Sequence, residues 1–221
     1  MSKICIVGDS WGTQRGWHPD LQKTNRHTMG WLKKLKGHKV KNFSIPGGTN
    51  GNTIHKATQY YRTHPSMMPK YIIWFHTESL RDRESGFFRR KYKIMDLTRE
   101  KAQDNYKKFN ALLKLTGAKD LIIGGQAPVI TELLEHEPYF LIEDWRSEIL
   151  GVPSVMTHSL VHHDLFENEN CLDDAETRTK MLEENIRIVD LCKDSIYFPD
   201  NAHPGGKAHY LLSQRLINYI E

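Results

Sequence analysis

The sequence predicts an α/β protein built on a doubly wound parallel sheet. Short apolar runs alternate along the chain with longer segments in which apolar residues recur at helical spacing. Strands that alternate with helices favour a parallel sheet covered by helices on both faces. The 221 residues are long enough to bury one sizeable core. Five strands in a doubly wound order are the simplest topology that fits these observations.

Each predicted element follows from a local pattern. The runs rich in apolar residues predict strands at Ile4–Val7, His38–Phe43, Tyr71–Phe75, Asp120–Gly124 and Ser195–Phe198. Amphipathic periodicity predicts helices at Thr28–Leu35, Thr53–Tyr61, Arg99–Leu115, Thr177–Cys192 and Ala208–Ile220. The order of these elements is the strand-helix alternation on which the fold class rests.

Two segments interrupt this alternation. Ser79–Leu97 and Gln126–Leu172 are long connections after the third and fourth predicted strands. Connections of that length are typical of lids or small added subdomains. We therefore expect a single domain over residues 1–221 with insertions at about 79–97 and 126–172.

Composition narrows the class of protein. A net charge of +4 falls short of a nucleic-acid-binding footprint, so we expect no nucleic-acid partner. Cys5, Cys171 and Cys192 form no paired-cysteine motif and are typical of reduced thiols in the cytoplasm. The first apolar run is too short for a signal peptide. No run approaches the ~18 apolar residues of a membrane span. We expect a cytoplasmic protein without a membrane span.

Four polar or glycine-rich stretches each follow a predicted strand. They are Gly8–Ser10, Pro46–Asn50, His76–Glu78 and Asp200–His203. In open α/β sheets, ligands bind at the carboxyl ends of the strands. Their shared location therefore predicts a functional site at that edge of the sheet.

The last stretch, within PDNAHPGGKAH, places Asp200 three residues before His203. A hydroxyl is a poor nucleophile until a base removes its proton, and a neutral imidazole suits that task. A carboxylate then fixes the imidazole tautomer and stabilises the imidazolium. Ser10, His203 and Asp200 are thus candidates for nucleophile, base and orienting residue. A purely structural role for His203, bonded to backbone at the start of a helix, remains open.

These motifs carry a resemblance to a known family. With GDS after the first strand, a glycine loop after the second and DxxHP near the C-terminus, the chain resembles the SGNH (GDSL-type) hydrolases from Gly8 to Pro204. The resemblance implies a flavodoxin-like three-layer fold and ester hydrolysis through an acyl-enzyme, without metal or organic cofactor. It assigns Ser10, His203 and Asp200 to the triad. It also assigns the Ser10 and Gly47 N–H groups to the oxyanion hole.

One block departs from the family pattern. Its members usually carry Gly-x-Asn-Asp after the third strand, and the Asn side chain is the third oxyanion donor. This chain has Phe75–Glu78, without Asn. Thr77 falls in the Asn position and its hydroxyl could donate one hydrogen bond. Glu78 would take that position if the register shifted by one, but its carboxylate would repel an oxyanion. Loss of such a donor typically costs about 10²–10³ in rate.

The resemblance thus favours a carboxylic ester hydrolase acting on a short acyl or acetyl group, on a carbohydrate or lipid carrier. Three alternatives stay open. A catalytically weak or inactive binding protein on the same scaffold would explain the missing Asn. Gly8–Gly12 also fits the G-x-S-x-G elbow of α/β-hydrolases, although only one strand precedes Ser10. Thr49–Thr53 has the composition of a phosphate-binding loop, as in a flavin- or nucleotide-binding protein.

No metal centre is expected. The HSLVHHD segment spaces His158, His162, His163 and Asp164 so that two imidazoles could share a helix face. A zinc site needs a third ligand, which nothing in the sequence supplies.

Overall fold

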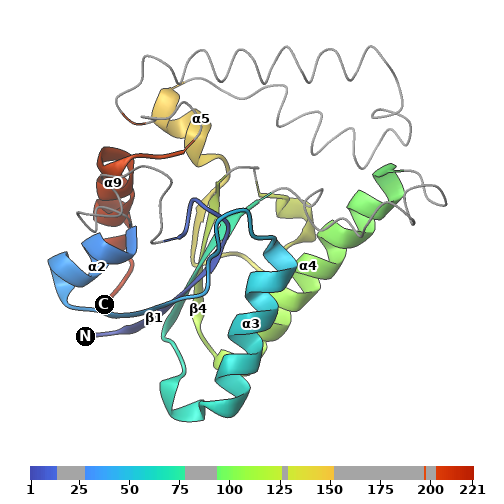
Figure 1. Cartoon of the computed structure of the whole chain (residues 1–221), viewed down its shortest axis with the longest axis horizontal. Helices are drawn as coiled ribbons and strands as arrows, with labels where there is room; N and C mark the ends of the chain where they lie inside the picture. Colours follow the sequence, from blue (N-terminus) through green and yellow to red (C-terminus); the bar gives the residue numbers. More distant parts are fainter. Residues whose placement is uncertain (14–27, 78–93, 126–128, 152–196, 198–202) are drawn as a thin grey trace.

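The centre of the fold is a five-stranded parallel sheet. The computed structural model describes residues 1–13, 28–77, 94–125, 129–151, 197 and 203–221 (Figure 1). Its strands pair in the order β2-β1-β3-β4-β5. Their bounds are β1 Lys3–Gly8, β2 Lys39–Asn42, β3 Tyr71–His76, β4 Lys119–Gly124 and β5 Phe140–Ile142. This is the doubly wound, flavodoxin-like order, so the predicted fold class is confirmed.

Helices cover both faces of the sheet. Helices α2 (Thr28–Lys36) and α9 (Gly206–Ile217) lie on one face, and α3 (Asn50–Thr63) and α4 (Ile94–Thr116) on the other (Figure 1). Helix α5 (Trp145–Leu150) follows β5. Two single turns of 3-10 helix, η1 (Pro65–Met67) and η4 (Thr131–Leu133), complete the described elements. The result is the three-layer arrangement of helix, sheet and helix.

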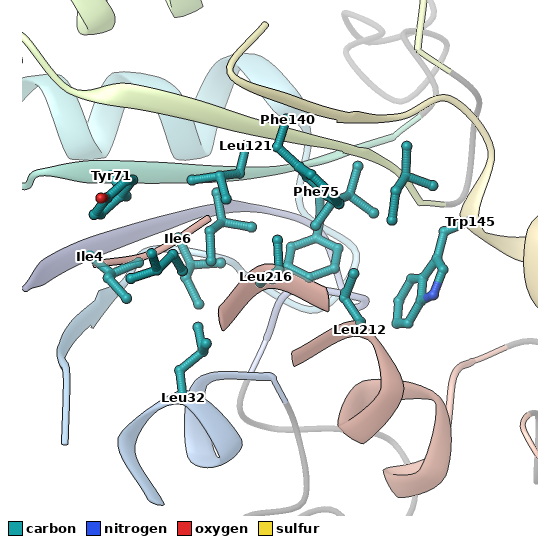
Figure 2. Packing of buried hydrophobic residues seen from close by; sticks show 14 of the residues in the cluster. Ile4, Ile6, Leu32, Tyr71, Phe75, Leu121, Phe140, Trp145, Leu212 and Leu216 are labelled. Atoms are coloured by element: carbon teal, nitrogen blue, oxygen red, sulfur yellow. The ribbon is translucent and has the colours of Figure 1, made fainter. Parts of the chain in front are cut away.

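The core has two halves because side chains alternate between the faces of a strand. Ile4 and Ile6 of β1 point toward α2 and α9, where they meet Leu32, Leu212 and Leu216 (Figure 2). The intervening residues Cys5 and Val7 pack on the opposite side with residues of α3 and α4. The central strands β1 and β3 are buried on both faces, which is why their sequences are nearly continuous apolar runs.

The fifth strand is not where the sequence predicted it. Ser195–Phe198 was predicted as that strand, but Tyr197, its one described residue, lies in a turn. The sheet instead takes Phe140–Ile142, which pairs with β4 and lies inside the predicted Gln126–Leu172 insertion. Three apolar residues are too few to give a strand pattern. Part of that connection therefore belongs to the sheet.

Four of the five helix predictions are confirmed, and three of these helices start earlier than predicted, α9 at Gly206 rather than Ala208. Helix α3 begins at Asn50 rather than Thr53, because the Thr49 hydroxyl caps it by accepting the Asn52 N–H (3.3 Å). Helix α4 begins at Ile94, inside the predicted 79–97 insertion. The remainder of that insertion and the predicted Thr177–Cys192 helix lie outside the described residues.

Candidate functional site

Ser10 lies in a tight turn directly after β1. The Gly12 N–H donates to the Asp9 carbonyl oxygen (3.1 Å), which closes the turn over Ser10 and Trp11. The Asp9 side chain reinforces it, because its Oδ1 accepts the Trp11 N–H (3.0 Å). The Asn42 amide then ties the turn to the end of β2 by donating to the Gly12 carbonyl oxygen (2.7 Å). The sequence GDSWG thus folds into a turn anchored on two sides.

Gly8 makes this turn possible. Its φ of 133° is rarely adopted by residues with a side chain, and a Cβ there would lie 2.3 Å from the Phe75 carbonyl oxygen. The close approach of β1 and β3 at this point requires glycine. The chain therefore leaves the sheet one residue before Asp9 and presents Ser10 beyond the strand end.

The predicted oxyanion donor Gly47 lies in the neighbouring loop. The Gly48 N–H donates to the Ile45 carbonyl oxygen (2.8 Å), and Gly47 has a φ of 66°. Pro46 followed by a glycine with positive φ is the signature of a type II turn. Gly47 is exposed, and its N–H makes no hydrogen bond within the described part of the chain. The Ile45 N–H donates to the Gly8 carbonyl oxygen (3.3 Å), which connects this loop to the Ser10 turn.

Asn50 is a site residue that the sequence interpretation missed. It is fully buried in the first turn of α3. Its Oδ1 accepts both the Trp74 indole N–H (3.0 Å) and the Thr77 backbone N–H (3.1 Å), and its Nδ2 donates to the Thr77 carbonyl oxygen (2.6 Å). These bonds fix the chain as it leaves β3. The only signal in the sequence was an Asn at the buried start of a helix, followed by a Trp on a buried strand.

The same helix turn also holds the end of β1. The Thr53 hydroxyl accepts the Gly8 N–H (3.1 Å) and donates back to the α3 backbone. Asn50 and Thr53 therefore connect α3 to the strand ends that precede Ser10 and Thr77. The side chains of these two residues are thus occupied within the protein. They are not available to bind a phosphate, as a phosphate-binding Thr49–Thr53 loop would require.

Thr77, predicted to replace the missing Asn, directly follows β3 and is fully buried. Its N–H is taken by Asn50, but its hydroxyl oxygen has no hydrogen-bond partner among the described residues. A buried hydroxyl without a partner is uncommon and destabilising. It is thus the one polar group of Thr77 that is available to a ligand. The alternative residue Glu78 lies outside the described residues.

His203 lies in the segment that leads into α9. It is partly buried and lies three residues before α9, the helix that packs against α2. The Gly205 N–H donates to the Tyr197 carbonyl oxygen (2.7 Å), which holds the segment that enters the helix. Its predicted partner Asp200 lies outside the described residues.

The site residues are thus only partly brought into contact. Hydrogen bonds connect the loops that carry Ser10, Gly47 and Thr77 into one unit at the carboxyl edge of the sheet. Ser10 is 7% exposed, and its hydroxyl makes no hydrogen bond to any described residue, His203 included.

Trp11, the residue after Ser10, belongs to the core. It is 1% exposed and packs edge-on against Trp145, with 5.6 Å between ring centroids. The Arg146 guanidinium lies over its ring at 5.1 Å. The Trp11 side chain therefore anchors the Ser10 turn to α5.

Neither a metal centre nor a membrane-spanning helix is found in the described part of the chain. Within the described ranges, no cluster of three His, Cys, Asp or Glu residues could hold a metal ion. The HSLVHHD segment lies outside those ranges. No described helix is long and apolar enough to cross a bilayer.

Comparison with known proteins returned solved structures only. No protein-family model and no curated protein matches the sequence. The similar structures include the psychrotrophic esterase EstA from Pseudoalteromonas sp., with a TM-score of 0.49 and 15% identity over 100% of this chain and 97% of that one. A member of the lipolytic G-D-S-L family from Veillonella parvula has a TM-score of 0.48 and 15% identity, covering 99% and 97%. A lipase/acylhydrolase from Enterococcus faecalis has 0.46 and 13%, covering 100% and 95%.

Proposed function

We propose that this chain is an SGNH hydrolase that cleaves a carboxylic ester through an acyl-enzyme intermediate. The observation that carries the proposal is the unit formed by the Ser10 turn and the Gly47 turn. Among the described residues, neither the Ser10 hydroxyl nor the Gly47 backbone N–H has a hydrogen-bond partner, and the two loops that carry them are directly connected. A nucleophile beside a preorganised N–H donor is the arrangement that acyl transfer requires.

The proposed reaction proceeds in two halves. His203 removes the proton from the Ser10 hydroxyl as the oxygen attacks the ester carbonyl, and Asp200 orients the imidazole. The tetrahedral oxyanion is stabilised by the N–H groups of Ser10 and Gly47 and by the Thr77 hydroxyl. His203 then gives its proton to the leaving alcohol. Water, deprotonated by His203, attacks the acyl-serine, and collapse of the second tetrahedral intermediate returns the proton to Ser10 and releases the acid.

Thr77 is the weakest part of this oxyanion hole. A hydroxyl rotates about its Cβ–Oγ bond, whereas an Asn amide presents its N–H in a fixed plane. Asn50 compensates in part, because it fixes the Thr77 backbone on both its N–H and its C=O side. We expect a slower enzyme than one with Asn at this position, by up to about 10²-fold.

Hydrolysis of p-nitrophenyl acetate tests the proposal. Wild type is compared with Ser10→Ala, His203→Ala and the control Ser66→Ala, whose serine lies exposed in η1. We expect turnover in wild type and control and none above background in the two site variants, all four being folded by circular dichroism. Equal turnover in Ser10→Ala and wild type would refute the proposal.

The second candidate is a binding protein that keeps the scaffold without the reaction. Two observations favour it: Asn is absent at position 77, and no hydrogen bond joins Ser10 to His203. A folded wild-type protein that turns over neither p-nitrophenyl acetate nor longer acyl esters would select this candidate.

A further inference from the structure

One edge of the sheet is strongly basic. Between Asp20 and Glu78 the chain contains ten lysines and arginines and no acidic residue, although the whole chain has 31 basic and 27 acidic residues. The described part of this stretch forms α2, the edge strand β2, α3 and β3. Six of its lysines are exposed around β2, and we call them the basic edge: Lys33, Lys34, Lys36, Lys39, Lys41 and Lys56.

These lysines gather from three elements. Lys33, Lys34 and Lys36 occupy the last turn of α2, which ends at the start of β2. Lys39 and Lys41 alternate with Val40 on β2, and Val40 packs in the core under α2 and α9. The two strand lysines therefore point to the α3 face. Figure 1 shows α2 and α3 on opposite faces of the sheet, so the lysines border the edge strand from both sides.

Lys56 joins the group through Tyr60. Residues 56 and 60 lie one helical turn apart on α3 and share a face. The Lys41 ammonium lies 4.5 Å from the Tyr60 ring centroid and 5.7 Å from that of Phe43. The His64 imidazole stacks on Tyr60, with the ring centroids 4.3 Å apart and the planes 10° apart. Cations and aromatic rings are thus interleaved along this part of the edge.

None of the six charges is neutralised within the described part of the chain. The ion pairs there involve other residues, such as Lys70 with Glu221 and Lys108 with Asp104. Lysines on an edge strand do prevent pairing with another sheet. That role accounts for Lys39 and Lys41, but not for the four lysines on helices. A surface of unpaired positive charge attracts an extended anion.

The basic edge adjoins the proposed site. Lys41 immediately precedes Asn42, whose amide donates to Gly12 in the Ser10 turn. The chain then continues through Phe43 into the loop that carries Gly47. An anionic polymer lying along β2 and α3 would therefore pass beside the loops of the site.

We propose that the basic edge binds an acidic polysaccharide, a polymer of sugar acids whose acyl esters reach Ser10. Three properties select this partner. A sugar acid offers a carboxylate for the lysines and an apolar ring face for the partly exposed Phe43. Polysaccharide hydroxyls carry carboxylic esters, whereas nucleic-acid backbones carry phosphodiesters. Of the large apolar side chains exposed in the described ranges, Leu35 lies within the basic edge and Tyr210 packs on Trp31 beside Lys34, too little for insertion into a bilayer.

Binding is measured first, because it does not depend on catalysis. Fluorescein-labelled polygalacturonate is titrated with the full chain and with Ser10→Ala, and anisotropy is read at low and at high salt. Neutral dextran of equal length, a DNA duplex and phosphatidylserine vesicles are the comparison ligands. We expect both proteins to bind polygalacturonate, more tightly than any comparison ligand, and added salt to weaken the binding.

Charge reversal locates the surface. The test variant is Lys39→Glu/Lys41→Glu/Lys56→Glu, and the control is Lys107→Glu/Lys108→Glu/Lys114→Glu on α4, which changes the net charge equally. We expect at least a 10-fold weaker affinity in the test variant, since three reversals each remove an attraction and add a repulsion. The control should change the affinity by less than about threefold. Equal losses in both variants would overturn the proposal.

The proposal that the polysaccharide carries the ester rests on the proposed hydrolase activity. A second measurement therefore tests polysaccharide binding and ester hydrolysis separately. On acetylated polygalacturonate the test variant should raise KM with little change in kcat, while its p-nitrophenyl acetate rate equals that of wild type. Binding without hydrolysis of either ester would refute the hydrolase and leave the binding surface standing. Tighter binding to DNA or to vesicles, or no binding beyond dextran, would overturn the polysaccharide assignment.

Discussion

Replacement of Asn50 by Ala should both destabilise the protein and impair the site. The substitution removes one amide and leaves three buried groups without their partner: the Trp74 indole N–H, the Thr77 N–H and the Thr77 carbonyl. A buried polar group that loses its partner costs about 1–3 kcal/mol. Water entering the small cavity will satisfy some of the three, so we expect a loss of about 4 kcal/mol in the free energy of unfolding.

The assay is urea denaturation followed by tryptophan fluorescence, with thermal unfolding as a second measurement. For a chain of this size, about 4 kcal/mol corresponds to a fall in Tm of roughly 8–16 °C. Trp74→Phe gives a graded comparison, because it removes only the indole donor and should cost about 1 kcal/mol from that lost bond. Asn52→Ala is the matched control, since Asn52 is exposed in the same helix turn.

Activity gives an independent readout of the same contact. Below its unfolding transition, Asn50→Ala should retain native secondary structure but hydrolyse p-nitrophenyl acetate more slowly, because the Thr77 backbone is no longer fixed. We expect a fall in kcat of about 10-fold, less than the roughly 10²–10³-fold lost when an oxyanion donor is removed outright. A stability within about 1 kcal/mol of Asn52→Ala, together with an unchanged kcat, would refute the reasoning.

Two further substitutions test the strand ends. Gly8→Ala should lose at least about 3 kcal/mol of stability, since its Cβ would meet the Phe75 carbonyl at 2.3 Å and its φ is positive. Gly37→Ala, with positive φ but open space, should lose only about 1 kcal/mol by urea denaturation, and equal losses would contradict the steric argument. Burial, with the nearby positive charges of the N-terminal amine and Lys36, lowers the pKa of His38. The unfolded chain therefore binds a proton at His38 more readily than the folded chain does. The free energy of unfolding of wild type should fall relative to that of His38→Asn as the pH drops below about 6.5. Parallel pH profiles of the two proteins would exclude this coupling.

The elements that the sequence predicted well are those whose burial is continuous or strictly periodic. Tyr71–His76 is buried at every position, and α4 keeps its apolar residues on one stripe, so each pattern is visible without knowledge of the neighbours. Phe140–Ile142 is a strand only because β4 lies beside it. No local pattern in three residues distinguishes such a strand from a loop.

The residues of the candidate site likewise include some that a local sequence pattern predicts and some that it does not. The turn at Ser10 was predictable because GDS follows a buried strand, and the Gly47 turn because Pro-Gly-Gly is a local signal. The role of Asn50 depends on which residues of β3 lie opposite the first turn of α3, separated from it by more than twenty positions in sequence. Such a contact is fixed by helix-sheet packing and has no local signature.

The attachment of two strand ends to one helix turn has a consequence for how activity is lost on heating. Thr53 binds the backbone of Gly8, and Asn50 binds that of Thr77, so both depend on the same few residues at the start of α3. Fraying of that turn would loosen the loop that carries Ser10 and the one that carries Thr77 together. Loss of activity on heating should therefore begin with a local event at the start of α3 that affects both loops and precedes melting of the sheet.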